Sequence, residues 1–186
     1  MVEETHYLHS VDDVVFIDGV AEAVAEANVR SIPVVMVTNQ AGIGRGLYGW
    51  DAFHAVQNHI REHYLGIGAH FDMVLACAYH AEGTGCYAVA DHPWRKPRPG
   101  MLMEAERLLG IDLKQSFIVG DTLADLVAGE SAGLPAGALV RTGHGKREWS
   151  EKAEEAFARW AGAGEFKAGW YGSGSDAIRD WLGNQP

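Results

Sequence analysis

The chain has 186 residues, close to the most common size of a single domain, so we expect one domain that spans residues 1–186. It carries 25 acidic against 15 basic residues, a formal net charge of -10, which argues against a general nucleic-acid binder because an acidic surface repels phosphate backbones. Hydrophobic residues make up 47% of the chain, which supports a packed core and excludes a disordered or fibrous protein.

The amino end, residues 1–6, has neither a basic start nor an apolar run, so it predicts no secretory signal and no membrane anchor. Apolar stretches elsewhere are far shorter than the roughly 20 residues that span a bilayer. Cys77 and Cys86 are too few for a disulfide framework, which favours a reducing compartment. We expect a cytoplasmic monomer with neither a membrane nor a nucleic-acid partner.

Hydrophobic spacing predicts alternating helices and strands over residues 19–142, which is typical of a parallel α/β sheet. In chain order the predicted elements are a helix at 19–30, strand 33–37, helix 51–64 capped by Asp51, strand 71–78, helix 99–109 ended by Gly110, strand 116–120, helix 123–132, strand 137–141, an amphipathic helix around 148–161, a weak strand at 166–171 and a terminal helix. Trp160, Trp170 and Trp181 are predicted to pack in or beside the core.

Candidate functional residues follow the predicted strands, because ligands of open parallel sheets bind outside the carboxyl ends of the strands. The three loops concerned hold residues 38–46 (TNQAGIGRG), 95–97 (RKP) and 120–125 (GDTLAD). Together they supply a hydroxyl, backbone amides, cations and carboxylates.

Asp121 comes at a strand end and Asp125 four residues later, one turn along a helix. A strand-end carboxylate suits Mg²⁺, which prefers carboxylate oxygens and keeps several waters, but Asp121 could instead cap the next helix. Asp125 could brace the loop or Lys96, or it could be a solvated helix residue.

Thr38 and the amides after it could hold a phosphate, while an ordinary strand-to-helix turn is the alternative. The spacing of the glycines in residues 38–46 does not match a dinucleotide-binding fingerprint. Lys96 lies in a cationic, proline-stiffened run at residues 94–98, which would suit a phosphate ligand or a solvated loop.

A second cluster contains two thiols and two imidazoles, which could form a tetrahedral zinc site. Its members are Cys77, His80, Cys86 and His92. Their spacing is irregular, and Cys77 at a strand end could be a small buried hydrophobe.

In order along the chain, residues 35–40 (VMVTNQ), 95–97 (RKP) and 120–125 (GDTLAD) resemble the second, third and fourth motifs of the haloacid dehalogenase superfamily. More narrowly, residues 38–46 and 95–101 (RKPRPGM) look like the D-glycero-D-manno-heptose 1,7-bisphosphate phosphatases, near relatives of histidinol-phosphate phosphatases. The similarity covers nearly the whole chain. It implies a Rossmann-like parallel sheet sandwiched by helices, without a large cap domain.

The resemblance implies an aspartyl-phosphate mechanism that depends on Mg²⁺. It implies that Asp121 is the metal ligand and that Asp125 supports the site. Of the two catalytic residues that it implies, Thr38 holds the phosphoryl group and Lys96 neutralises its charge. The residues that it assigns to the substrate are Thr38, Asn39, Gln40, Ala41, Arg45, Arg95, Lys96, Glu4 and Tyr7.

The first family motif, Asp-x-Asp-Gly at the end of an apolar strand, is absent. Residues 16–20 (FIDGV) match only its end, since Phe16 stands where the first Asp belongs, and residues 2–9 (VEETHYLH) look like those that follow the motif. We therefore expect the first central strand and both catalytic aspartates to lie upstream of Met1, and the 186 residues alone to be inactive. By resemblance this strand lies mid-sheet, so its loss would leave backbone groups unpaired on both neighbours.

Zinc-bearing members of the family place Cys-x-His before a Cys-x-Cys that abuts the Arg-Lys-Pro motif. Here Tyr79 takes the first His position, while His92 and Trp94 occupy the paired Cys positions. We expect no zinc, with Cys77, His80 and His92 as a degenerate remnant.

The leading hypothesis is Mg²⁺-dependent hydrolysis of D-glycero-D-manno-heptose 1,7-bisphosphate to the 1-phosphate. The alternatives are a phosphatase of histidinol phosphate or another small phosphate ester, and a non-catalytic relative that binds phosphorylated ligands.

Overall fold

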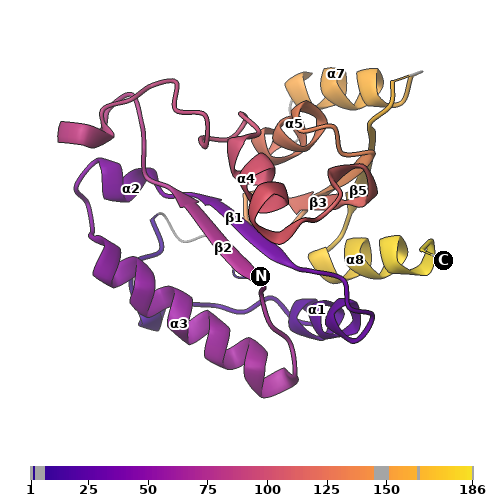
Figure 1. The fold of residues 1–186 in the computed structure, drawn as a ribbon, viewed down its shortest axis with the longest axis horizontal. Coiled ribbons are helices and arrows are strands. Elements are labelled where there is room, and N and C mark those ends of the chain that lie inside the picture. Colours follow the sequence, from indigo (N-terminus) through magenta and orange to yellow (C-terminus); the bar gives the residue numbers. More distant parts are fainter. Residues whose placement is uncertain (1, 3–6, 145–150, 163, 186) are drawn as a thin grey trace. The chain divides into compact units, whose positions relative to one another are not determined.

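The computed structural model describes residue 2 and residues 7–144, 151–162 and 164–185 (Figure 1). The chain divides into two compact units, Met1–Arg95 and Lys96–Pro186. Each unit contains its own parallel sheet and helices. The single domain across residues 1–186 stays a prediction.

The first unit alternates short strands with helices in the predicted order. Its elements are η1 (Val11–Asp13), α1 (Val20–Val29), β1 (Val35–Asn39), α2 (Ala41–Gly44), α3 (Trp50–Ile67), β2 (Met73–Cys77) and η2 (Gly85–Tyr87). Strands β1 and β2 pair in parallel, with Thr38 opposite Ala76. The four predicted helices and strands of residues 19–78 are confirmed, while α2 was not expected.

Helix α3 buries one apolar stripe. Phe53, Val56, Ile60 and Tyr64 recur at helical spacing and are all buried. The predicted cap at Asp51 is wrong, because the helix begins earlier. Gly49 is the N-cap and Asp51 lies in the first turn. The earlier start follows from packing of Trp50, whose indole meets Phe53 edge-on and donates a hydrogen bond to the Tyr87 hydroxyl at 2.9 Å.

The second unit holds a three-stranded parallel sheet in the order β3-β4-β5. Its elements are α4 (Gly100–Leu109), η3 (Leu113–Gln115), β3 (Phe117–Gly120), α5 (Leu123–Ser131), β4 (Ala136–Val140), α7 (Glu151–Trp160), β5 (Lys167–Tyr171) and α8 (Gly174–Gly183). Gly110 ends α4 as predicted, in the left-handed conformation that glycine adopts without strain. Residues 148–150 of the predicted amphipathic helix lie outside the described residues.

The core of the second unit packs aliphatic side chains of the sheet and α5 against aromatic rings from its carboxyl-terminal part. Leu126 and Leu139 are fully buried, and Trp160 meets Phe166 edge-on within the same cluster. Trp181 of α8 stacks on Phe117 with ring centroids 5.6 Å apart. The predicted packing role of the carboxyl-terminal tryptophans is confirmed.

The fold class is an α/β fold with parallel sheets flanked by helices, as predicted. In the strand order of the described residues, β1 and β3 each border one strand, β2 and β4 respectively. Among the described helices, none combines the length and the apolar character needed to cross a bilayer.

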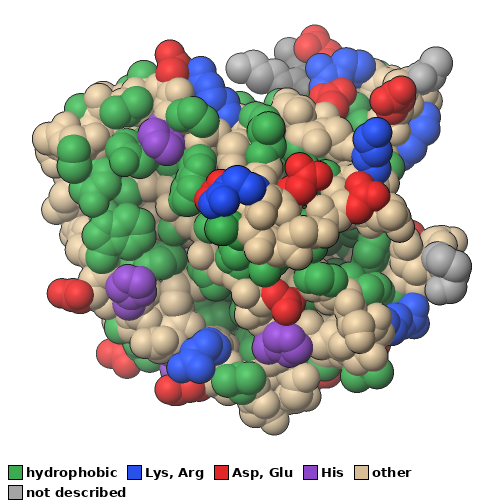
Figure 2. All heavy atoms as spheres, in the orientation of Figure 1, with side chains coloured by type: hydrophobic (Ala, Val, Ile, Leu, Met, Phe, Trp, Pro, Cys, Tyr) green, Lys and Arg blue, Asp and Glu red, His purple; other side chains and the backbone are tan. Residues whose placement is uncertain are grey.

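The surface of the described residues mixes apolar and charged side chains (Figure 2). Val29, Leu47 and Met103 are among the exposed apolar residues, and Val29 is 85% exposed. Isolated apolar side chains are ordinary on a folded protein's surface, so these residues do not mark a binding site by themselves.

Candidate functional site

The residues at the carboxyl end of β1 form a polar loop that a short helix continues. Thr38 and Asn39 are the last two residues of β1, and Ala41 begins α2. The Gln40 amide donates to the Thr38 hydroxyl at 2.9 Å, while the Tyr48 hydroxyl donates to the other end of that amide at 2.5 Å. The Thr38 hydroxyl is thus oriented by a chain of side-chain hydrogen bonds.

Two glycines of this loop are required by close packing. A Cβ atom on Gly44 would lie 2.0 Å from the carbonyl oxygen of Ala78, and one on Gly42 would lie 2.2 Å from the Tyr48 ring. Gly46 has a different role, because its φ of +74° lies in the left-handed region. The glycine spacing therefore reflects how tightly this loop packs in the first unit.

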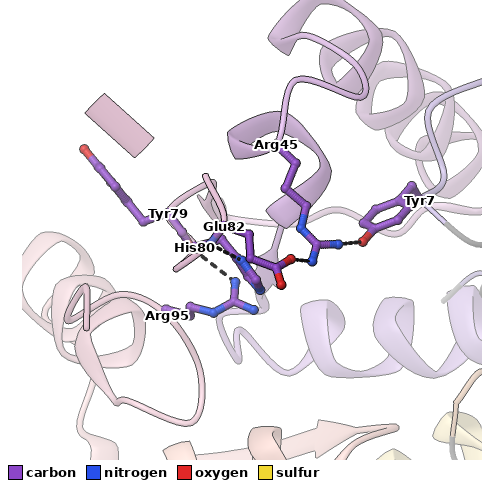
Figure 3. A network of polar contacts seen from close by, with 6 residues as sticks. All are labelled: Tyr7, Arg45, Tyr79, His80, Glu82 and Arg95. Carbon is purple, nitrogen blue, oxygen red and sulfur yellow. Dashed lines mark hydrogen bonds and ion pairs between the residues drawn. The ribbon is translucent and has the colours of Figure 1, made fainter. Parts of the chain in front are cut away.

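Arg45 caps the carboxyl end of α2, and its guanidinium lies among polar partners of the first unit (Figure 3). It donates to the Tyr7 hydroxyl and pairs with the Glu82 carboxylate. Arg95 donates to the backbone carbonyl of Tyr79 at 3.1 Å, and partial burial lowers its pKa. Two predicted substrate residues, Arg45 and Tyr7, are thus in direct contact. A third, Glu4, lies outside the described residues.

The predicted remnant of a zinc site contains a histidine that stacks on an aromatic ring. His92 stacks on Tyr79 with ring centroids 3.7 Å apart and an interplanar angle of 9°. The Nδ1 atoms of His80 and His92 lie 3.0 and 3.2 Å from the backbone amides of Glu82 and Trp94. These contacts let each imidazole accept a hydrogen bond in its neutral form.

Cys77 is buried at the end of β2, and burial raises the pKa of its thiol, which disfavours the thiolate that binds metals. Cys86 is exposed. Within the described part of the chain, His, Cys, Asp and Glu side chains form no group of three placed to hold a metal ion.

The second unit contains a nearly buried ion pair at the start of α5. Lys96 Nζ lies 2.6 Å from Asp125 Oδ1, and the two side chains are 12% and 7% exposed. Asp125 Oδ2 accepts hydrogen bonds from the Thr122 backbone amide at 3.0 Å and from its hydroxyl at 2.8 Å. Thr122 and Asp125 form the capping box of α5. The alternative that Asp125 is a solvated helix residue is wrong.

Position 120 requires glycine because the Asp125 side chain packs directly on its backbone. A Cβ atom on Gly120 would lie 2.2 Å from Asp125 Cβ. The alternative that Asp121 caps α5 is also wrong, since Thr122 is the N-cap. Asp121 Oδ2 instead accepts a hydrogen bond from the His144 amide at 2.9 Å.

Asp121 fits one ligand position of a Mg²⁺ ion. Its carboxylate follows the carboxyl end of β3, and Mg²⁺ is commonly held by one or two carboxylates together with waters and substrate phosphate. Asp125 is less suited to a ligand role, because its two oxygens already face Lys96 and Thr122.

A hollow of about 280 Å³ in the second unit is lined by residues of β3, β4, β5 and α8. Its lining includes Phe117, Ala136 and Lys167, the first residues of β3, β4 and β5. Asp121 is not among the residues that line this hollow.

The predicted residues fall into two groups, one in each unit. Thr38, Asn39, Gln40, Ala41, Arg45, Arg95 and Tyr7 belong to the first unit, and Lys96, Asp121 and Asp125 to the second. Sequence reasoning missed Glu82, Tyr79 and His144, each of which contacts a predicted residue. No motif marks Glu82 or His144, and Tyr79 was noted only as a departure from the zinc motif; the contacts of all three come from loop packing.

Comparison with known proteins matches residues 93–161 to the HAD-hydrolase-like family. The D-glycero-beta-D-manno-heptose-1,7-bisphosphate 7-phosphatase of Mesorhizobium japonicum is 51% identical over 137 residues, which cover 74% of this chain and 63% of that protein. The enzyme of the same name from Pasteurella multocida is 39% identical over 137 residues, 74% of each chain. The matched part of the chain thus spans less than two thirds of the first relative and about three quarters of the second.

Two solved structures of phosphatases are also similar to this chain. A HAD-like phosphatase from Mesorhizobium loti superposes with a TM-score of 0.82 and 42% identity, covering 98% of this chain and 79% of that one. The D,D-heptose 1,7-bisphosphate phosphatase from B. bronchiseptica, complexed with magnesium and phosphate, gives a TM-score of 0.79 and 25% identity, covering 99% and 93%.

The chain therefore belongs to the haloacid dehalogenase-like phosphatases. Within that family its relatives are the heptose 1,7-bisphosphate phosphatases, as the sequence resemblance predicted.

Proposed function

We propose that this protein takes part in the Mg²⁺-dependent hydrolysis of D-glycero-D-manno-heptose 1,7-bisphosphate, releasing the 7-phosphate and leaving the 1-phosphate. The main support is that three phosphoryl-handling motifs occur in the family's order in a chain 51% identical to a phosphatase named for this substrate. Two of these motifs lie at the carboxyl ends of β1 and β3, where ligands of parallel sheets bind.

In this proposal the first unit supplies neutral hydrogen-bond donors to the phosphoryl oxygens. The Thr38 hydroxyl is oriented by Gln40, and backbone amides follow at the start of α2. Donors held in place before the substrate arrives stabilise developing negative charge without reorganising during the reaction.

Lys96 and Asp121 supply two charged groups. Lys96 offers a cation to the phosphoryl group, and Asp125 holds its ammonium from the capping box of α5. Asp121 would hold Mg²⁺, which when bound offsets the negative charge of the phosphoryl group.

The nucleophile in this proposal comes from a segment upstream of Met1. No Asp-x-Asp occurs in the 186 residues, and Phe16 stands two positions before Asp18. In addition, β1 and β3 each border a single strand in the described sheets, which leaves each of them an edge where a further strand could pair.

A non-catalytic protein that binds phosphorylated ligands is the second candidate. The same missing Asp-x-Asp favours it, because the nucleophilic and acid–base steps have no evident replacement among residues 1–186. It predicts binding of a phosphate ester without turnover.

The test compares the 186-residue chain with a protein extended by the codons upstream of Met1. Phosphate release from the heptose bisphosphate and from histidinol phosphate is measured with Mg²⁺ and with EDTA. We expect Mg²⁺-dependent release by the extended protein alone, with the heptose bisphosphate preferred. An in-frame stop upstream with no Asp-x-Asp-Gly, or robust turnover by the unextended chain, would refute the upstream nucleophile.

Two variants of the extended protein test the assigned roles. Thr38→Ala should lower kcat about 100-fold, the typical effect of removing one preorganised donor. Asp121→Asn should raise the Mg²⁺ concentration needed for half-maximal rate. Asp51→Asn, which removes an exposed carboxylate in the first turn of α3, is the matched control and should leave both values unchanged. Phosphate-ester binding by an extended protein that shows no turnover would support the non-catalytic candidate instead.

A further inference from the structure

Glu82 is an acidic residue placed among cationic ones in the first unit. Figure 3 shows its carboxylate directed at the guanidinium of Arg45, with His80 and Arg95 close by. No sequence motif includes Glu82, and the roles proposed above for the substrate residues do not use it.

The backbone around Glu82 is held firmly while its side chain stays accessible. The Glu82 amide lies 3.0 Å from His80 Nδ1, and the Thr84 amide donates to the Gly44 carbonyl at 2.7 Å. The Glu82 side chain is nevertheless 68% exposed, and that of Arg45 is 30% exposed. The carboxylate can therefore leave Arg45 by side-chain rotation alone, without unfolding the turn.

The surroundings of this pair favour anions. Burial lowers the pKa of His80, and the nearby charges of Arg95 and Arg45 lower it further, so the positive potential of the two guanidiniums reaches the imidazole. An exposed carboxylate–guanidinium pair is only weakly stabilising. A phosphoryl group carries more charge and binds a guanidinium through two parallel hydrogen bonds.

We propose that Glu82 occupies on Arg45 the position of an anionic group of the ligand, and that it lowers the affinity of this site for phosphoryl groups by competing for the guanidinium. The identity of the phosphorylated ligand rests on the proposed function, whereas the competition between Glu82 and a phosphate does not. A phosphoryl group would displace the carboxylate into solvent and keep the second contact of Arg45, the Tyr7 hydroxyl.

The test is an NMR titration of the 186-residue chain with inorganic phosphate, followed on the side-chain Nε–H signal of Arg45. That signal is assigned by its loss in Arg45→Gln. We expect Glu82→Gln to bind phosphate about fivefold more tightly than the unmodified chain, as expected for removing one nearby negative charge at a partly exposed site. Glu62→Gln, which removes an exposed carboxylate on α3, is the matched control and should change the affinity less than twofold.

The gain in phosphate affinity caused by Glu82→Gln must also depend on Arg45. We expect Arg45→Gln with Glu82→Gln to bind phosphate no more tightly than Arg45→Gln alone, followed on backbone amides of residues 79–84. Unchanged or weaker binding by Glu82→Gln, the same gain in Glu62→Gln, a gain that persists without Arg45, or no detectable phosphate binding by Glu82→Gln would each overturn the inference.

These outcomes are separable from those of the proposed function. Tighter phosphate binding by Glu82→Gln, together with no turnover of the heptose bisphosphate by the extended protein, would support the competition and refute the phosphatase proposal. Turnover by the extended protein, with no effect of Glu82→Gln on phosphate affinity, would support the phosphatase proposal and refute the competition.

Discussion

The ion pair between Lys96 and Asp125 allows a quantitative prediction about the second unit. Asp125→Asn removes the carboxylate charge but keeps an oxygen that can accept the two hydrogen bonds from Thr122. The substitution therefore separates the charge of Asp125 from its capping role. In that orientation the amide N–H₂ group faces the Lys96 ammonium.

The size of the effect follows from distance and burial. At 2.6 Å and an effective dielectric constant of about 20, the attraction is about 6 kcal/mol before desolvation. Removing one partner of a buried pair typically costs about 3–5 kcal/mol. Because Lys96 is 12% exposed and water can reach part of it, we expect the lower value, about 3 kcal/mol. In a chain of this size this corresponds to a fall in Tm of about 6–12 °C.

The assay is urea unfolding followed by tryptophan fluorescence, with Trp160, Trp170 and Trp181 as reporters in the second unit. A double variant, Lys96→Met with Asp125→Asn, should regain most of the loss, because replacing both charges removes the desolvation penalty along with the attraction. A loss below about 1 kcal/mol in Asp125→Asn, or a double variant less stable than the single one, would contradict this account of the pair.

Three further outcomes are expected. Gly44→Ala should destabilise the chain by about 1–3 kcal/mol in chemical unfolding, since the new Cβ would lie 2.0 Å from the Ala78 carbonyl oxygen; unchanged stability would contradict the close packing. Tyr79→Leu should lose about 1 kcal/mol of stacking on His92, whereas added Zn²⁺ or EDTA should leave the Tm of the unmodified chain unchanged; a rise in Tm with Zn²⁺ would show that the loop binds metal. A hydrogen bond to a carboxylate, together with burial, raises the pKa of Tyr171 from 10.0 to about 12, so its stabilising effect is present below pH 10 and lost as the pH rises toward 12. The Tm difference between the unmodified chain and Tyr171→Phe should therefore shrink over that interval, and a constant difference would contradict the assignment.

The alternation of helices and strands was predictable because each element carries its own periodicity. Helix α3 shows an apolar residue at every turn on one face, and β4 is an uninterrupted apolar run whose residues after the first are buried. The start of α3 was not predictable in the same way. Trp50 joins the helix through contacts with Phe53 and with Tyr87, and the second of these lies 37 residues further along the chain.

In the candidate site, too, contacts between residues close in sequence can be predicted, whereas contacts between distant residues cannot. Residues 120–125 contain both members of the capping box, so the interaction between Thr122 and Asp125 is visible as local spacing. Glu82 belongs to no motif, and its contact with Arg45 depends on a turn anchored to Gly44. Sequence could identify the residues that chemistry requires, but it could not identify those that reach the site through loop packing.

The boundary between the two compact units falls within the Arg-Lys-Pro motif, at the peptide bond that joins Arg95 to Lys96. Arg95 donates a hydrogen bond to the Tyr79 carbonyl in the first unit, and Lys96 forms an ion pair with Asp125 in the second. A protein engineer who wished to divide the gene into two complementing fragments would naturally cut between compact units. In this protein that cut would separate two adjacent cations, each already bound within its own fragment. Mixing the two fragments of the extended protein would therefore show whether phosphatase activity needs a covalent link between these cations.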